Sequence, residues 1–313
     1  MAQDCLGFCL SQSPFYNLNE GWRWMFWSEL IPCVLFLGLL FLVPKSPRWL
    51  ILKGCDGEAL DILNKIHGEE AACAAVMDIK ESLDGGKVLP FQDMFKKSVF
   101  PIVVIGSVIS ALQQLTGINA ILYFGADIFE TALGFAQEDV LAQQILLAGV
   151  NFLFTLIALF SVDEWGRKPL MIWGSLGMVV GLLMVGFTLM TNKIGIFSLM
   201  GILMFIASFA MSMGPIVWVL LSEMFPNNIR SGAMSIAVVV QWAMNYVVSQ
   251  LFPIVVESEV NNNAFWNGSL PYFIFIFFIL MIIAFTMKYV PETKGKSLEE
   301  LEKIWKQKYG ELT

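Results

Sequence analysis

The stretch QQLTGINAILY, residues 113–123, sets three amide side chains inside a run that carries no charge from residue 99 to 124. A helix of that length crosses a bilayer core of about 30 Å, because each residue adds about 1.5 Å. An unsatisfied polar group is costly in hydrocarbon, so Gln113, Gln114 and Asn119 are expected to face protein or a water-filled cavity. The stretch therefore predicts a membrane helix with polar side chains at depth.

Two interpretations of these amides stay open on the residues alone. Hydrogen bonding between neighbouring helices explains about one such side chain per helix, whereas a polar ligand site uses several. On a straight helix, at about 100° per residue, Gln114 and Asn119 lie roughly 140° apart and cannot share a face. Gly117 lies between them and offers a local bend.

The composition assigns the broad class. Hydrophobic residues make up 57% of the chain, charged residues 14%, and the mean hydropathy is +0.69, which is far from a soluble domain. We expect an all-α integral membrane protein with seven transmembrane helices. The charge-poor runs that predict them are residues 24–43, 99–124, 140–162, 169–190, 194–221, 232–256 and 270–287.

The basic residues predict the orientation of the chain in the membrane. Of the 19 Lys and Arg, all but Arg23 and Lys193 fall on connections to one side, which is therefore cytoplasmic. This puts the N-terminus outside and the C-terminus in the cytoplasm. The expected parts are an external segment, a first span, a cytoplasmic helical linker, six further spans and a cytoplasmic tail, over residues 1–23, 24–43, 44–98, 99–290 and 291–313.

Enzyme, metal and cofactor chemistry find no support in the sequence. The five cysteines form no CxxC pair, and His67 is the only histidine, so neither a metal site nor a histidine-based triad is expected. Nothing predicts nucleic-acid binding. Glu29 is the one acidic residue inside a predicted span, and an interfacial role is favoured over proton handling. A seven-helix receptor would share the topology, but the long connection after the first span disfavours it.

Later spans carry further polar and aromatic groups. Gly214 and Pro215 predict a flexible kink, because proline removes a backbone hydrogen bond. Trp218 lies near the level of that kink, where its ring suits the apolar face of a sugar. In the next span Gln241 and Asn245 share a face at i, i+4, and their amides can hydrogen-bond hydroxyl groups without any charge.

Five motifs give these features a common origin. They are PKSPRWL at 44–50, QQLTGIN at 113–119, DEWGRKP at 163–169, SEMFPNNIR at 222–230 and PETKGKSLEELE at 291–302. In this order they resemble the sugar porter family of the major facilitator superfamily over nearly the whole chain from Gly21. The segments GWRWMF, GPIVWVLLSE and QWAMNY are most similar to bacterial members that carry D-xylose together with a proton.

The resemblance implies secondary transport of a monosaccharide, with D-xylose and proton symport expected, by alternating access across a bacterial inner membrane. Uniport, or symport of arabinose, galactose or glucose, stays as an alternative. The chain would hold the sixth helix and the C-terminal six-helix half, so the partners expected are the sugar, a proton, the lipid bilayer and a missing N-terminal half. The residues it places against the sugar are Gln113, Gln114, Asn119, Trp218 and Gln241, with Tyr123, Asn151, Trp242 and Asn245 nearby.

The resemblance also implies an inner-gate network of charged side chains. It consists of Asp163 with Arg167, Glu223 with Arg230, Arg48, and Glu292. The sequence departs from the family at Lys45, where the motif usually has a glutamate (PESPR). This exchange predicts repulsion between Lys45 and Arg48 and weakens the expected closure of the gate.

Overall fold

The computed structural model describes residues 23, 27, 29–84, 91–96, 99–125, 128, 137–193, 195–226, 229–295, 301 and 305. All regular elements among them are helices. The chain divides into two compact units, mainly residues 6–89 and residues 90–313. Each unit is described by itself below.

Among the described residues of the first unit, four helices are present. They are α3 (Leu30–Leu40), α4 (Pro47–Leu52), α5 (Asp56–His67) and α6 (Glu69–Asp84). No residue of α3 is buried, whereas Leu50, Ile51 and Ala59 form a small core between α4 and α5. Helices α4, α5 and α6 all lie within residues 44–98, the predicted linker. Lys45 Nζ lies 3.6 Å from a carboxylate oxygen of Glu58, so this lysine has an attractive partner where the sequence predicted repulsion.

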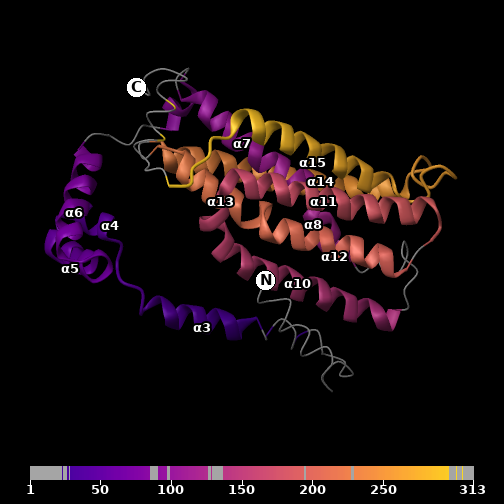
Figure 1. Cartoon of the computed structure of the whole chain (residues 1–313), viewed down its shortest axis with the longest axis horizontal. Helices are drawn as coiled ribbons and strands as arrows, with labels where there is room; N and C mark the ends of the chain where they lie inside the picture. Colours follow the sequence, from indigo (N-terminus) through magenta and orange to yellow (C-terminus); the bar gives the residue numbers. More distant parts are fainter. Residues whose placement is uncertain are drawn as a thin grey trace. The chain divides into compact units, whose positions relative to one another are not determined.

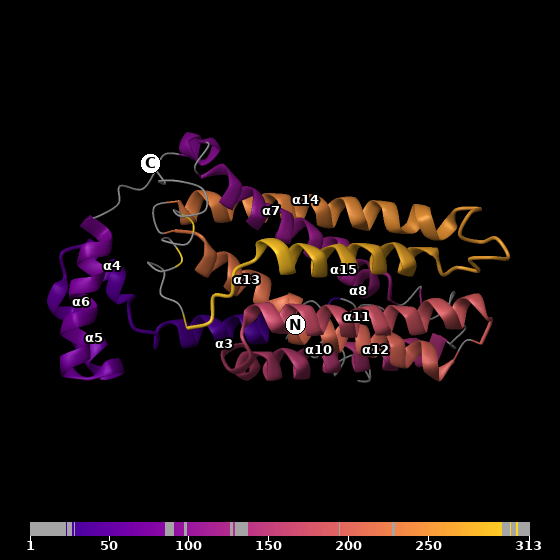
Figure 2. The ribbon, with the colours of Figure 1, turned by 45° about the horizontal axis from the view of Figure 1, so that its top comes forward.

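The second unit is a bundle of long helices preceded by a short 3-10 turn (Figure 1). Its elements are η2 (Phe91–Phe95), α7 (Phe100–Leu115), α8 (Ile118–Tyr123), α10 (Gln137–Trp165), α11 (Arg167–Met190), α12 (Ile196–Met211), α13 (Met213–Met224), α14 (Arg230–Glu257) and α15 (Leu270–Tyr289). Helix α11 packs against both α12 and α15, and α14 packs against α7. Figure 2 shows α11 running alongside α15.

Six helical segments of the described chain are long and apolar enough to cross a membrane. They match the six later predicted spans, at residues 100–123, 145–165, 167–190, 196–224, 230–257 and 270–289. The first predicted span is not confirmed, because α3 has only 11 residues. Residues 24–26 and 28 of that span lie outside the described residues.

Two of these spans are broken near the positions that the sequence marked. Gly117 adopts a left-handed conformation with φ +83° between α7 and α8. A side chain there would lie 2.4 Å from the Phe275 ring, so only glycine fits. The other break falls at Ser212 (φ −126°, ψ −89°), because Pro215 lacks an N–H for the carbonyl of Met211 and its ring would clash with it. The predicted kink is confirmed, shifted toward the N-terminus.

Glycines bring α11 and α12 into close contact. A Cβ atom at Gly181 would lie 2.6 Å from the backbone oxygen of Gly201, and one at Gly174 would lie within 2 Å of the Ser212 hydroxyl. Small residues of this kind let membrane helices approach through their backbones. The α11–α12 pair therefore forms a closely packed support beside the broken helix.

Candidate functional site

Gln113 ties α7 to the break between α12 and α13. Its Nε2 donates to the backbone oxygen of Met213 at 2.7 Å and approaches that of Gly214 at 3.5 Å. Only 2% of Gln113 is exposed. Removing one partner of a buried hydrogen bond costs about 1–3 kcal/mol, so this contact fixes the amide where the span is broken.

Gln241 brings α14 to the same place. Its Nε2 donates to Gln113 Oε1 at 2.7 Å, and the residue is buried, as Gln113 is. The oxygen Oε1 of Gln241 is also buried and has no hydrogen-bond partner among the described residues. The two glutamines, 128 positions apart in the sequence, thus form one hydrogen-bonded pair.

Asn119 joins the remaining amides. Its Nδ2 donates to Gln114 Oε1 at 2.7 Å and to Asn245 Oδ1 at 2.9 Å. The bond from Asn119 to Gln114 spans the break at Gly117. In a straight helix these two side chains would point in different directions, and the turn at Gly117 brings them together. The local bend expected at Gly117 is observed. We call Gln113, Gln114, Asn119, Gln241 and Asn245 the amide cluster.

The aromatic residues assigned to the site lie outside this hydrogen-bonded group. Trp218 on α13 is 40% exposed, and within the described residues the amide hydrogen bonds do not reach it. Tyr123 and Trp242 are also exposed. Asn151 on α10 accepts a hydrogen bond from Thr155 through its backbone oxygen at 2.7 Å. The roles of these four residues toward a ligand stay predictions.

The amide cluster is neutral and offers both N–H donors and oxygen acceptors. These are the groups that recognise hydroxyls, each of which can donate and accept. An open groove of about 380 Å³ lies elsewhere, between α10 and α12, and its lining is apolar apart from Ser208. Among the described residues, no group of three His, Cys, Asp or Glu side chains could hold a metal ion. Among the described residues of this unit, the amide cluster is the candidate site for a polar, uncharged ligand.

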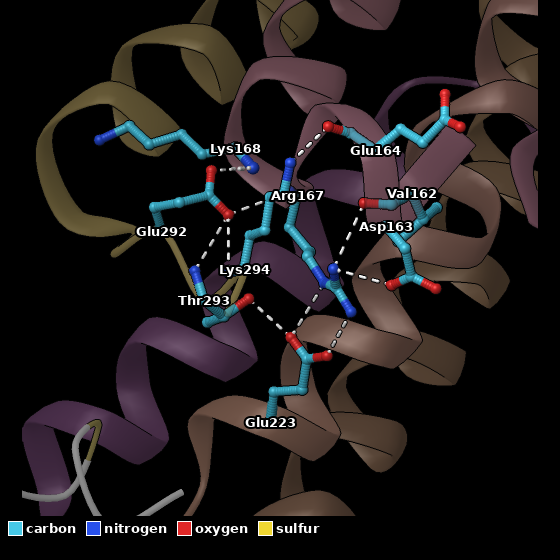
Figure 3. Close-up of polar contacts among 9 residues, drawn as sticks. All are labelled: Val162, Asp163, Glu164, Arg167, Lys168, Glu223, Glu292, Thr293 and Lys294. Atoms are coloured by element: carbon cyan, nitrogen blue, oxygen red, sulfur yellow. Dashed lines mark hydrogen bonds and ion pairs between the residues drawn. The ribbon is translucent and has the colours of Figure 1, made fainter. Parts of the chain in front are cut away.

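A second polar group surrounds the N-terminus of α11 (Figure 3). Arg167 donates to both carboxylate oxygens of Glu223 on α13, at 2.8 Å from Nη2 and 3.2 Å from Nε. Its Nη1 lies 3.1 Å from Asp163 Oδ1. The Arg167 side chain is 12% exposed and that of Glu223 26%, whereas Asp163 is 79% exposed. The sheltered bond to Glu223 is therefore the stronger one.

The segment after α15 completes this group. The carboxylate of Glu292 accepts the backbone N–H groups of Arg167 at 3.0 Å and Lys168 at 3.1 Å, which satisfies the free donors at the start of α11. The hydroxyl of Thr293 donates to Glu223 Oε2 at 2.6 Å. We call Asp163, Arg167, Glu223, Glu292 and Thr293 the α11 network.

The α11 network contains some of the charged contacts predicted for a gate and adds others; its action as a gate stays a prediction. The pairing of Asp163 with Arg167 is as predicted, and Arg167 is the bidentate partner of Glu223. Arg230 donates from Nε to the backbone oxygen of Phe225 at 3.1 Å. Arg48 belongs to the other compact unit, so its part in a gate stays a prediction.

Sequence reasoning missed Thr293 and Trp305. Trp305 lies in the predicted cytoplasmic tail but is 1% exposed. Its Nε1 donates to the backbone oxygen of Met224 at 3.1 Å, at the end of α13. The apolar spacing from Leu301 to Trp305 was the available signal, since residues at i, i+4 share a helix face. Leu301 is also buried.

Comparison with known proteins places nearly the whole chain in a family of sugar transporters. Residues 5–305 match the family profile described as sugar (and other) transporter. The D-xylose-proton symporter of Escherichia coli K12 is 45% identical over 308 residues, covering 96% of this chain and 61% of that protein. The glucose facilitated diffusion protein of Zymomonas mobilis is 38% identical, covering 92% and 60%. The chain thus spans about three fifths of the length of these relatives.

Solved structures of a xylose transporter are also similar to this chain. A structure of the major facilitator superfamily proton:xylose symporter XylE, bound to 6-bromo-6-deoxy-D-glucose, matches with a TM-score of 0.82 at 43% identity and covers 97% of this chain and 64% of that one. The inward open conformation of XylE from E. coli matches with a TM-score of 0.68 at 42% identity, covering 97% and 62%.

Proposed function

Because the chain belongs to the sugar transporter family of the major facilitator superfamily, we propose that its amide cluster forms one wall of a monosaccharide site. The chain is a multi-pass membrane protein, and its relatives are transporters rather than enzymes. Membership of a transporter family decides against the seven-helix receptor. The proposed substrate is D-xylose, carried together with a proton, as the name of the 45% identical relative suggests.

The observation that carries this proposal is the meeting of amides from three helices. Gln113 and Gln114 come from α7, Asn119 from α8, and Gln241 and Asn245 from α14. Hydrogen bonding between helices explains about one such side chain per helix, whereas α7 and α14 each contribute two amides to these bonded groups. A pentose has several hydroxyl groups and no charge, so amides orient it without holding it too tightly to be released.

The α11 network supports transport by alternating access. Its contacts join α10, α11, α13 and the segment after α15 at one end of the bundle. Several such pairs, made or broken together, shift an equilibrium between two conformations by a few kcal/mol. We propose that the network holds this end closed in one state and releases it in the other.

The location of the proton is also a proposal. In the described parts of the six spanning helices, carboxylates lie only near the helix ends, as with Asp163, Glu223 and Glu257. A carboxylate outside residues 99–290 therefore carries the coupling in this proposal, and Glu29 is a candidate to assist. The chain would be oriented with its C-terminus in the cytoplasm and would work with helices equivalent to the other half of its relatives.

A second candidate is transport of another sugar, with or without a proton. The glucose facilitated diffusion protein of Zymomonas mobilis and the arabinose-proton symporter of Bacillus subtilis are 38% and 36% identical to this chain. The amide cluster suits any neutral monosaccharide. Competition of D-xylose uptake by D-glucose and L-arabinose separates these candidates.

A completed transporter tests the proposal. The 313 residues replace the matching part of the E. coli D-xylose-proton symporter, and uptake of radiolabelled D-xylose is measured in cells that lack their own xylose transporters. We expect uptake that a protonophore abolishes, and loss of uptake in Gln241→Ala. Gln143→Ala is the matched control, since Gln143 is a buried glutamine on α10 outside the amide cluster.

Two results would contradict the proposal. One is a completed transporter that reaches the membrane but neither binds nor moves any of the three sugars. The other is sugar uptake by liposomes that contain only the 313 residues, which would show that the amide cluster is not merely one wall of the site.

A further inference from the structure

The segment that leads into α7 exposes three aromatic rings that lie next to one another. Phe91 and Phe95, the two ends of η2, are 57% and 61% exposed, and Phe100, the first residue of α7, is 45% exposed. The ring centroids are 6.1 Å apart for Phe91 and Phe95, and 6.4 Å apart for Phe95 and Phe100. We call these three residues the aromatic strip. A contiguous exposed apolar patch marks a surface that contacts a membrane or another protein.

Buried residues fix the same segment to the bundle. Met94 is 1% exposed, and its sulfur lies 3.1 Å from the position that a Cβ atom would take at Gly232, in the first turn of α14. The backbone oxygen of Lys96 accepts the N–H groups of Val99 at 3.1 Å and Phe100 at 2.8 Å, and Val99 is fully buried. The rings are therefore presented outward by a turn that is packed on its other side.

The aromatic strip lies where a membrane span begins. Residues 100–123 are one of the six helical segments long and apolar enough to cross a membrane, so η2 lies just outside the apolar layer. Exposed rings inside a span contact lipid as a matter of course, whereas rings outside it need another reason. A Cβ atom at Gly106 would lie 2.4 Å from the ring of Phe225, directly after α13. The aromatic strip thus belongs to the end of the bundle that carries the α11 network.

The charges beside the aromatic strip favour lipid as its partner. The sequence places two basic residues, Lys96 and Lys97, directly after η2, which contains one acidic residue, Asp93. Lys96 is exposed. Apolar rings followed by lysines suit the interfacial region of a bilayer, where rings contact the acyl chains and ammonium groups face the phosphates. A surface that packs on protein has no comparable need for lysines at its edge.

We propose that η2 and the first turn of α7 form an interfacial membrane anchor, in which the aromatic strip enters the boundary between the headgroups and acyl chains of a phospholipid bilayer. Because η2 leads directly into α7, the anchor fixes the depth in the membrane of the helix that carries Gln113 and Gln114. This inference goes beyond sugar binding and does not depend on it.

Nitroxide labels measure the depth of the aromatic strip. A single cysteine for the label is placed by Phe91→Cys or Phe95→Cys in a cysteine-free form of the completed transporter, in vesicles of phosphatidylethanolamine and phosphatidylglycerol. Collisions with oxygen, which concentrates in the bilayer, are compared with collisions with a water-soluble nickel chelate. We expect both labels about 5–10 Å inside the headgroup–acyl boundary. A label at Phe277, 60% exposed within α15, should lie deeper, and one at the exposed Cys55 should lie in water.

A second measurement asks whether the rings drive this insertion. The label is moved to Lys96, and Phe91→Gln and Phe95→Gln are introduced together. We expect the label to shift toward water, because the apolar groups that hold the segment in the bilayer are gone. Phe265→Gln is the matched control, since Phe265 is 65% exposed in the connection between α14 and α15, and it should leave the label where it was. All three rings are exposed, so the variants should keep their fold, which the melting temperature checks.

Three results would overturn the anchor. Labels at Phe91 and Phe95 that the nickel chelate reaches as readily as the label at Cys55 would place the aromatic strip in water. Labels that neither reagent reaches would show that another part of the protein covers it. An unchanged depth of the Lys96 label in the double variant would show that the rings do not hold the segment. None of these results involves a sugar, so each leaves the proposed function standing, and loss of sugar binding would leave the anchor standing.

Discussion

The contact between Arg167 and Glu223 gives the most quantitative prediction. It consists of two charge-assisted hydrogen bonds between side chains that are 12% and 26% exposed. Each such bond contributes about 1.5–3 kcal/mol when fully sheltered. Partial solvent exposure and the ordering of both side chains reduce the total. We expect a coupling free energy of about 2 kcal/mol, equivalent to roughly a thirtyfold change in an equilibrium constant.

A double-mutant cycle measures this coupling. The free energy of unfolding of the purified chain in mixed detergent micelles is determined for Arg167→Gln, Glu223→Gln and the double variant. The matched control is the cycle with Asp163→Asn, because Asp163 contacts the same guanidinium at 3.1 Å but is 79% exposed. We expect at most about 0.5 kcal/mol for that pair. Equal coupling in the two cycles would refute the argument that shelter from solvent makes the Glu223 contact the stronger one.

Three further predictions concern stability and are read from the melting temperature of the purified chain. Gly117→Ala should destabilise the chain by more than about 1–2 kcal/mol, because Gly117 has φ +83° and the Phe275 ring fills the space a Cβ would need. The control Gly38→Ala should not destabilise the chain, because a Cβ there meets nothing within 4 Å. Gly181→Ala should lower it strongly because backbone atoms of α12 cannot move aside; an unchanged value would disprove that close packing. Glu292→Gln should cost about 1 kcal/mol by weakening the cap on α11.

Much of the membrane architecture could be predicted from the sequence. Charge-poor runs of spanning length can be counted directly, and six of them became long helices. Gly117 and Pro215 could be interpreted because each has a backbone property that a regular helix cannot accommodate. The pairing of Gln241 with Gln113 could not be predicted, because it depends on how α14 packs against α7.

The first predicted span and the α11 network show two other limits. The first predicted span, residues 24–43, stays a prediction, because α3 has 11 residues and residues 24–26 and 28 lie outside the described part of the chain. The charged motifs indicated that acidic and basic side chains form contacts at this end of the bundle, but they did not show which side chains pair with each other. The bidentate partner of Arg167 is Glu223, 56 residues away, while the nearby Asp163 is mostly exposed.

Trp305 was missed for a related reason. A tryptophan in a charged tail is typical of an exposed segment, and its burial depends on the free backbone oxygen of Met224 at the end of α13. Free carbonyl groups at helix ends are present in every sequence, so only the fold reveals which one receives a donor.

The D-xylose affinity of the completed transporter tests the central claim most directly, namely that the amide cluster is a sugar-binding wall. Loss of an amide that bonds a neutral ligand costs about 0.5–1.5 kcal/mol or more, so Gln241→Ala and Asn119→Ala should weaken binding by about twofold to more than tenfold. Gln143→Ala should leave it unchanged. Wild-type affinity and uptake in both cluster variants would show that these amides only hold the helices together.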